Sequence, residues 1–141
     1  MKGYLLDTNV VSELRKGSRA DSNLLAWWQA VDEEELFLSV LVLGELRSGV
    51  ERIRRRDPAQ AQALERWLVD LEDTYADRIF PITAAIADRW GRLSAGDPLS
   101  VVDSLMAATA IQNNLTLVTR NTEDVRRTGV NFLNPFENVR T

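Results

Sequence analysis

The chain contains no histidine and no cysteine among its 141 residues. Without cysteine it can form no disulfide, no thiolate nucleophile and no zinc site of the cysteine type. Without histidine it can form no Ser-His-Asp triad and has no imidazole to act as a general acid or base. Of the remaining catalytic chemistries, the one best suited to this chain uses carboxylates that hold Mg²⁺ or Mn²⁺ to act on phosphate esters.

Long apolar runs are also absent, because no stretch approaches the roughly 20 residues that a membrane helix needs. Residues 1–7 contain too few apolar residues for a signal peptide, so we expect a cytoplasmic location. Hydrophobic residues make up 45% of the chain and charged residues 27%, which is an ordinary globular composition. The length is that of one domain with its own core, so we expect a single domain over residues 1–141.

Lysine is scarce: of the 17 basic residues only Lys2 and Lys16 are lysines, and the net charge is −4. A net acidic domain is not the usual profile of a nucleic-acid binder, although a cation bound by clustered carboxylates would offset the local charge. Four arginines form a basic cluster, namely Arg52, Arg54, Arg55 and Arg56. They can be a solvated helix end, or they can contact phosphate or a partner.

The apolar pattern predicts short strands that alternate with helices. Strands are predicted over residues 3–6, 36–39, 78–82, 115–119 and 130–133. Helices are predicted over residues 10–16, 22–31, 40–56, 58–74, 84–93, 101–113 and directly after Asn121, with loops at 17–19 and 94–98. Apolar strands separated by helices pair in parallel, with helices on both faces. The predicted fold class is therefore α/β, a three-layer α/β/α sandwich with a short, mostly parallel sheet.

Three acidic residues, Asp7, Glu45 and Asp103, interrupt the most apolar stretches of the chain. Asp7 ends the first predicted strand, and Glu45 has mostly apolar or small residues three and four positions away on its helix. Asp103 lies in a helix that is apolar on nearly every side. A carboxylate in such surroundings is costly unless it is paired or bound to a cation. We therefore expect the three side chains to be shielded from water and to converge on one divalent ion.

Structural interpretations of these residues remain open. Aspartate is favoured at helix N-termini, so Asp7 can simply cap the helix that follows it. Ser100 and Asp103 match the S-x-x-[DE] capping box. For Glu45 the mostly apolar neighbours favour a functional role over a solvating one.

A further polar segment, Thr119 to Asp124, follows the clearest predicted strand. The carboxyl ends of parallel strands meet at one edge of a sheet, where ligands bind, so this segment is expected near Asp7. Asn121 can cap the next helix and Asp124 can occupy its third position, while Thr119 and Arg120 add a hydroxyl and a cation. We expect the segment to form part of the same site.

These residues fall in four ordered motifs that resemble those of PIN-domain ribonucleases, especially the VapC toxins and their FitB-like branch. The motifs are Leu5–Leu14, Ser39–Leu46, Asp103–Ala110 and Leu117–Asp124. The resemblance runs over about residues 4–136, nearly the whole chain. One departure is that many relatives carry an aspartate where this chain has Asn121, and Asp124 is then the nearest carboxylate.

The resemblance implies an endoribonuclease dependent on Mg²⁺ or Mn²⁺ that acts as the toxin of a toxin–antitoxin module and uses a metal-activated water. Its catalytic and metal-binding residues would be Asp7, Glu45, Asp103 and Asp124. Residues expected to orient ligands or contact RNA are Thr8, Asn9, Ser12, Thr119, Arg120 and Asn121. The implied partners are a VapB-type antitoxin, a second copy of the chain in a homodimer, and operator DNA through the antitoxin only.

Other Mg²⁺-dependent α/β proteins fit the sequence poorly. A receiver domain needs an acidic pair after its first strand and a late lysine, and a haloacid-dehalogenase-type phosphatase needs an aspartate where Asn9 stands. A PIN-like binding module with an impaired site is the remaining alternative, because of Asn121. The tryptophans have two interpretations, as core residues or as a groove for an antitoxin segment or a dimer contact; they are Trp27, Trp28, Trp67 and Trp90.

Overall fold

A five-stranded sheet forms the centre of the computed structural model, which describes residues 3–95 and 99–137. The strands are β1 (Tyr4–Leu6), β2 (Leu36–Ser39), β3 (Ile79–Phe80), β4 (Thr116–Val118) and β5 (Phe132–Leu133). Their order in the sheet is β3-β2-β1-β4-β5, and every neighbouring pair is parallel. The predicted parallel α/β sheet is confirmed, and β3 is the edge strand that Pro81 leads us to expect.

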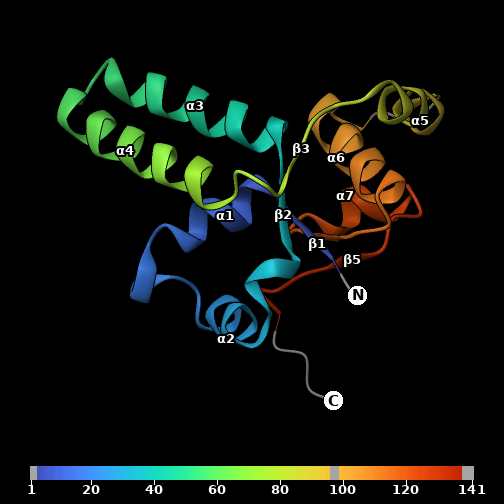
Figure 1. Ribbon diagram of the computed structural model, residues 1–141, viewed down its shortest axis with the longest axis horizontal. Helices are drawn as coiled ribbons and strands as arrows, with labels where there is room; N and C mark the ends of the chain where they lie inside the picture. Colours follow the sequence, from blue (N-terminus) through green and yellow to red (C-terminus); the bar gives the residue numbers. More distant parts are fainter. Residues whose placement is uncertain (1–2, 96–98, 138–141) are drawn as a thin grey trace.

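Helices cover both faces of this sheet. They are α1 (Thr8–Leu14), α2 (Ser22–Ala30), α3 (Val40–Arg54), α4 (Pro58–Thr74), α5 (Ala84–Ser94), α6 (Val101–Gln112) and α7 (Thr122–Arg126). In Figure 1, α1 to α4 lie on the left of the sheet and α5 to α7 on the right, which gives the three-layer sandwich. Right-handed crossovers explain this division, because the chain crosses the sheet in one direction before β3 and returns in the other after it.

The order of the strands places a topological switch point at the centre of the sheet. From β1 the chain steps outward through β2 to β3, then returns to the other side of β1 to form β4. The connections leaving β1 and β4 therefore diverge to opposite faces and open a crevice at the carboxyl ends of these strands. The amide of Asp7 donates to the carbonyl oxygen of Val118 at 2.9 Å, which holds the two strand ends together.

Local capping signals account for most helix boundaries. Asp21, Asp57, Thr83 and Ser100 each accept a hydrogen bond from a backbone amide in the first turn of α2, α4, α5 and α6. The predicted start of the first helix at residue 10 is wrong, because Asp7 caps it and α1 begins two residues earlier. The predicted loop at 94–98 lies partly outside the described residues.

Two apolar clusters stabilise the fold. The larger one contains the buried strand residues Leu5, Leu6, Leu38, Leu117 and Val118, with helix residues from both layers. A smaller one joins α3 to α4, which form a helical hairpin. None of the described helices is long and apolar enough to cross a membrane.

The outer face of the α3–α4 hairpin carries a group of ion pairs. Arg47 and Arg54 of α3 both bind Glu65 of α4, and both also bind Glu51 within α3. These side chains are each more than a third exposed, so solvent screening limits what they add to stability. One arginine of the predicted basic cluster, Arg54, is thus occupied in a structural contact.

Arg78 connects the end of α4 to the start of β2. Its guanidinium donates to the backbone carbonyl oxygens of Leu36 at 3.2 Å, Thr74 at 3.0 Å and also Glu33, and its side chain is only 12% exposed. It also lies 4.6 Å from the ring centroid of Tyr75. Burial of this ring raises the pKa of Tyr75 to about 12, although the charge of Arg78 acts against the shift.

We expect Arg78→Ala to lower the free energy of unfolding by about 2–4 kcal/mol, because it removes one charged donor to three backbone carbonyl oxygens, of which that of Leu36 is partly buried. Urea denaturation followed by circular dichroism measures this loss. Arg92→Ala is the control, because Arg92 is 80% exposed and its ion pair is with Asp88, one turn earlier in α5. Equal midpoints for the two variants would show that the contacts of Arg78 do not stabilise the fold.

Candidate active site

Asp7 lies at the switch point, where β1 ends beside the end of β4, and is only 7% exposed. Its Oδ1 accepts the amide of Thr8 at 2.8 Å, so it caps α1. Its Oδ2 accepts the hydroxyl of Thr119 at 2.7 Å and the side-chain amide of Asn9 at 3.4 Å. The cap that the sequence allowed for Asp7 is therefore confirmed. Thr119, directly after β4, fixes the orientation of the same carboxylate through its other oxygen.

The electrostatic environment of Asp7 disfavours its charge. Burial raises the pKa of its carboxyl above the ordinary value, and the negative charges of Asp103 and Glu45 raise it further. The hydrogen bonds from Thr119 and Thr8 lower it, but they do not cancel the shift. The charges of Glu45 on α3 and Asp103 on α6 therefore both reach Asp7 at the end of β1, and a cation beside Asp7 would relieve the repulsion.

Glu45 reaches the crevice from α3, where its Oε1 accepts the hydroxyl of Thr8. The prediction that it is shielded from water is wrong, because Glu45 is exposed. Its apolar neighbours in sequence pack beneath α3, whereas the glutamate itself projects over the crevice, with α1 as its neighbour. Its second oxygen, Oε2, makes no hydrogen bond to any residue that the structure describes.

Asp103 lies in the first turn of α6 and is half-buried. Its amide donates to the Ser100 hydroxyl at 3.1 Å, which confirms one of the two bonds expected of a capping box. Its carboxylate forms no hydrogen bond or ion pair with the described residues, yet its charge acts on Asp7. It therefore has oxygen lone pairs available for a ligand.

The segment after β4 holds the Asp7 carboxylate in place by hydrogen bonding and adds no carboxylate next to it. Thr119 is fully buried and, besides binding Asp7, accepts the amide of Asn121 at 3.0 Å. The amide of Arg120 donates to Asn9 at 3.4 Å. The guanidinium of Arg120 lies 3.7 Å from the ring centroid of Phe136, so in this structure it is directed to the C-terminal segment.

The structure does not bring Asp124 into contact with the three carboxylates. Asp124 is exposed on α7, and its charge is not among those that act on Asp7. The predicted cap by Asn121 is also wrong, because its side chain makes no capping hydrogen bond to α7. The fourth position of the site stays a prediction for either residue.

The donor set fits a hard divalent cation that keeps much of its water. Within residues 3–95 and 99–137, no three acidic side chains stand close enough together to enclose one metal ion. Mg²⁺ does not need such a cage, since it commonly binds through one or two carboxylates and retains several waters. Asp7, Asp103 and Glu45 are the residues here that could hold such a cation, directly or through its water.

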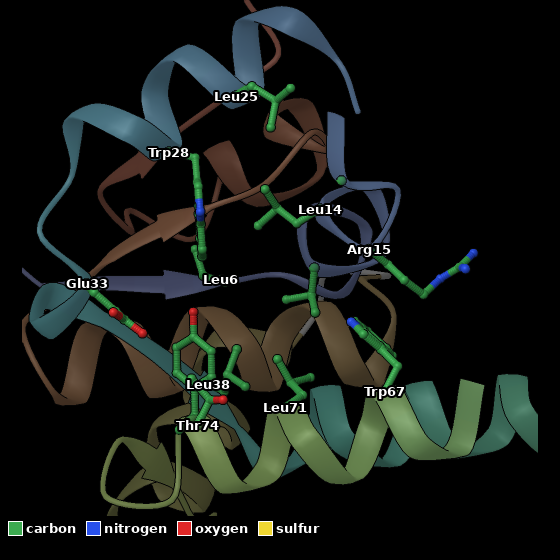
Figure 2. Close-up of a pocket in the computed structure, with 13 residues that line it drawn as sticks. Leu6, Leu14, Arg15, Leu25, Trp28, Glu33, Leu38, Trp67, Leu71 and Thr74 are labelled. Carbon is green, nitrogen blue, oxygen red and sulfur yellow. The ribbon is translucent and has the colours of Figure 1, made fainter. Parts of the chain in front are cut away.

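Two hollows are lined by residues of α1; the sequence offered a tryptophan-lined groove as one interpretation of the first, and the second was not expected. The first is an apolar cavity of about 310 Å³ between α1, α2 and α4, in which Trp28 and Trp67 project from opposite sides (Figure 2). The second is a groove of about 280 Å³ between α1, α3 and α4 that includes Ser12 and Arg15. The spacing of Thr8, Ser12 and Arg15, four and three residues apart, already indicates one polar helix face and was the available signal.

Comparison with known families gives a match over most of the chain. The family model described as PIN domain matches residues 4–131. The chain is 31% identical to VapC ribonuclease Y4jK of Sinorhizobium fredii, over 94% of this chain and 97% of that protein. It is 30% identical to toxin FitB of Neisseria gonorrhoeae, again over 94% of this chain and 97% of that protein.

Solved structures are similar over the same extent. A structure of FitAB bound to a DNA fragment aligns with a TM-score of 0.86 and 26% identity, over 97% of this chain and 98% of that chain. A toxin–antitoxin complex from Klebsiella pneumoniae aligns with a TM-score of 0.70 and 26% identity, over 96% and 99% of the two chains. The parallel sheet and its flanking helices thus recur in these proteins.

We expect Asp7→Asn to stabilise the metal-free protein at neutral pH. The raised pKa means that folded protein binds this proton more tightly than unfolded chain, so stability falls as pH rises from the ordinary value of 3.8 through the raised pKa. Asparagine still caps a helix but carries no charge to bury. Thermal melting in a chelating buffer should show a higher midpoint for the variant at neutral pH and no difference in acid.

The control is Asp88→Asn, at an exposed position on α5. A stabilisation by Asp7→Asn that persists unchanged in acid would contradict the assigned cause, because protonated Asp7 is also uncharged.

Proposed function

Because the chain belongs to the PIN domain family, we propose that it is an endoribonuclease dependent on Mg²⁺ or Mn²⁺ and the toxin of a VapBC-type module. The observation that carries the proposal is the placement of buried Asp7 at the switch point, where Thr119 and Thr8 hold its carboxylate and the charges of Glu45 and Asp103 both reach it. Their convergence at the switch point of a parallel sheet supports a ligand-binding role. The ribonuclease and toxin relatives support the substrate class and the biological role.

In this proposal Asp7 and Asp103 hold the cation, with Glu45 near it and Asn121 or Asp124 completing the site. A bound cation would supply Lewis acidity toward the phosphate and would activate water. Thr119, Asn9 and the Thr8 amide keep the Asp7 carboxylate in one orientation.

Glu45 is the residue placed to move a proton. The Thr8 hydroxyl holds its Oε1, while Oε2 makes no hydrogen bond to a described residue and faces the crevice from an exposed position. A carboxylate held on one side and open on the other can accept a proton from an attacking water. In a chain without histidine this carboxylate is the best available general base.

We expect Asp103→Asn to reduce RNA cleavage at least about 100-fold. The substitution removes a proposed cation ligand, and no other described residue is placed to replace it. The measurement is the rate of product release from labelled RNA by purified protein in Mg²⁺ or Mn²⁺, with a chelator lane. Asp88→Asn, which changes the same group on the outer face of α5, should cleave at the unsubstituted rate. Undiminished cleavage by Asp103→Asn would refute the assignment.

The rival function is a PIN-fold binding module with an impaired site, which the amide of Asn121 favours because it cannot neutralise a second cation. The two functions differ in a titration with Mn²⁺. A nuclease should show saturable Mn²⁺ binding that Asp103→Asn abolishes, together with RNA products. A binding module should bind Mn²⁺ weakly and release no product with either metal.

The proposal includes an antitoxin as partner, a homodimer, operator DNA contacted through the antitoxin only, and action on RNA in the cytoplasm. Complexes named FitAB and toxin–antitoxin among the structural relatives support the first of these. The cavity between Trp28 and Trp67 is the surface best suited to an apolar antitoxin segment (Figure 2). Aromatic side chains in an open apolar pocket are typical anchors of protein interfaces.

We expect Trp28→Ala to weaken co-purification with the cognate antitoxin at least about tenfold, because large aromatic anchors dominate such interfaces. Trp27→Ala is the matched control on the same helix, since Trp27 packs edge-to-face on Tyr4 at 5.4 Å and does not line the cavity. Melting midpoints of both variants confirm that they fold. Equal antitoxin binding by the two variants would show that the cavity is not the docking surface.

A further inference from the structure

The groove between α1, α3 and α4 opens directly from the acidic crevice. Its volume is about 280 Å³, and one end is formed by Thr8 and Glu45. From there it runs past Arg15, Gly49 and Arg52 to Trp67. A polymer whose reacting group sits at the carboxylates can therefore continue into this groove.

The charge along the groove is opposite to that of the crevice. Arg15 is exposed and forms no ion pair within the described part of the chain, and Arg52 forms only a 3.4 Å hydrogen bond to the Ser48 hydroxyl. This contrasts with Arg47 and Arg54 of the same hairpin, which are held by Glu51 and Glu65. Two arginines without carboxylate partners beside a phosphate-cleaving site are suited to the next phosphates of a nucleic acid.

The far end of the groove offers an aromatic ring. Trp67 projects from α4 toward α1, where Arg15 lies above it (Figure 2), and it is half-buried. An unpaired base can stack on such a ring, whereas bases in a duplex are already stacked on each other. Gly49 keeps the groove open: a Cβ there would meet only the guanidinium of Arg52, at 3.8 Å.

We propose that this groove is the subsite for a single-stranded nucleotide next to the scissile phosphate, with Arg15 and Arg52 on its phosphates and Trp67 under its base. The inference rests on the proposed ribonuclease function and adds the residues that hold the nucleotide next to the scissile phosphate. Arg15 and Arg52 are positioning residues, since they contact the substrate beside the reacting group.

The test is binding of a fluorescein-labelled single-stranded RNA of mixed sequence, measured by anisotropy with Ca²⁺ in place of Mg²⁺ so that cleavage is suppressed. Arg15→Gln and Arg52→Gln should each reduce the slope of log affinity against log salt by about 0.7. Gly49→Leu should fill the groove and weaken binding about tenfold. The same RNA annealed to its complement should bind the unsubstituted protein more weakly than the single strand does.

Matched controls are Arg56→Gln and Gly91→Leu. Arg56 lies beyond the end of α3 and does not line the groove, and a Cβ at Gly91 on α5 meets nothing within 4 Å. Both controls should bind RNA as the unsubstituted protein does, and melting midpoints confirm that all five proteins fold.

Equal losses for groove and control variants would overturn the inference, because only net charge would then matter. Unchanged RNA binding by the groove variants would also overturn it. So would groove variants that lose antitoxin binding but keep RNA binding. Either result leaves the nuclease proposal intact if the unsubstituted protein still cleaves RNA. Absence of any cleavage with Mg²⁺ or Mn²⁺ would instead refute the proposed function.

Discussion

The buried hydrogen bond from the Thr119 hydroxyl to the Asp7 carboxylate is the contact on which the site depends. It spans 2.7 Å and joins the ends of the two central strands, at the point where their connections diverge. A carboxylate buried there is unfavourable, and Glu45 and Asp103 make it more so. The fold retains an arrangement that costs stability, which is typical of sites that bind a cation or a substrate.

Three separate elements deliver the carboxylates, and each is fixed by a different interaction. Asp7 is fixed by the sheet, and Glu45 by the Thr8 hydroxyl, which ties α3 to α1. Asp103 is placed by the capped first turn of α6, on the opposite layer. Both helical layers therefore contribute to the site, and residues of α1 line both the groove, which includes Glu45, and the apolar cavity, which does not.

Much of the fold follows from short-range features of the sequence. Apolar strands between capped helices predict the parallel sandwich, and the caps at Asp21, Asp57, Thr83 and Ser100 set helix boundaries by local hydrogen bonds. The placement of Asp7 and Asp103 at one edge of the sheet also follows from the pattern, because the carboxyl ends of the strands and the starts of the helices share that edge. The prediction that Asn121 caps α7 is wrong at a local level too. Its backbone amide donates to the Thr119 hydroxyl, and its side chain makes no capping hydrogen bond.

The sequence by itself therefore determined the class of fold, the ends of most elements and the three acidic positions, since these depend on residues near one another in the chain. Only the tertiary structure decided that Glu45 is exposed, that Asp124 stands apart, and which arginines are paired. Exposure and pairing depend on the packing of α1 against α3 and of α3 against α4. Composition cannot supply these facts, because a net charge of −4 does not reveal where each charge lies.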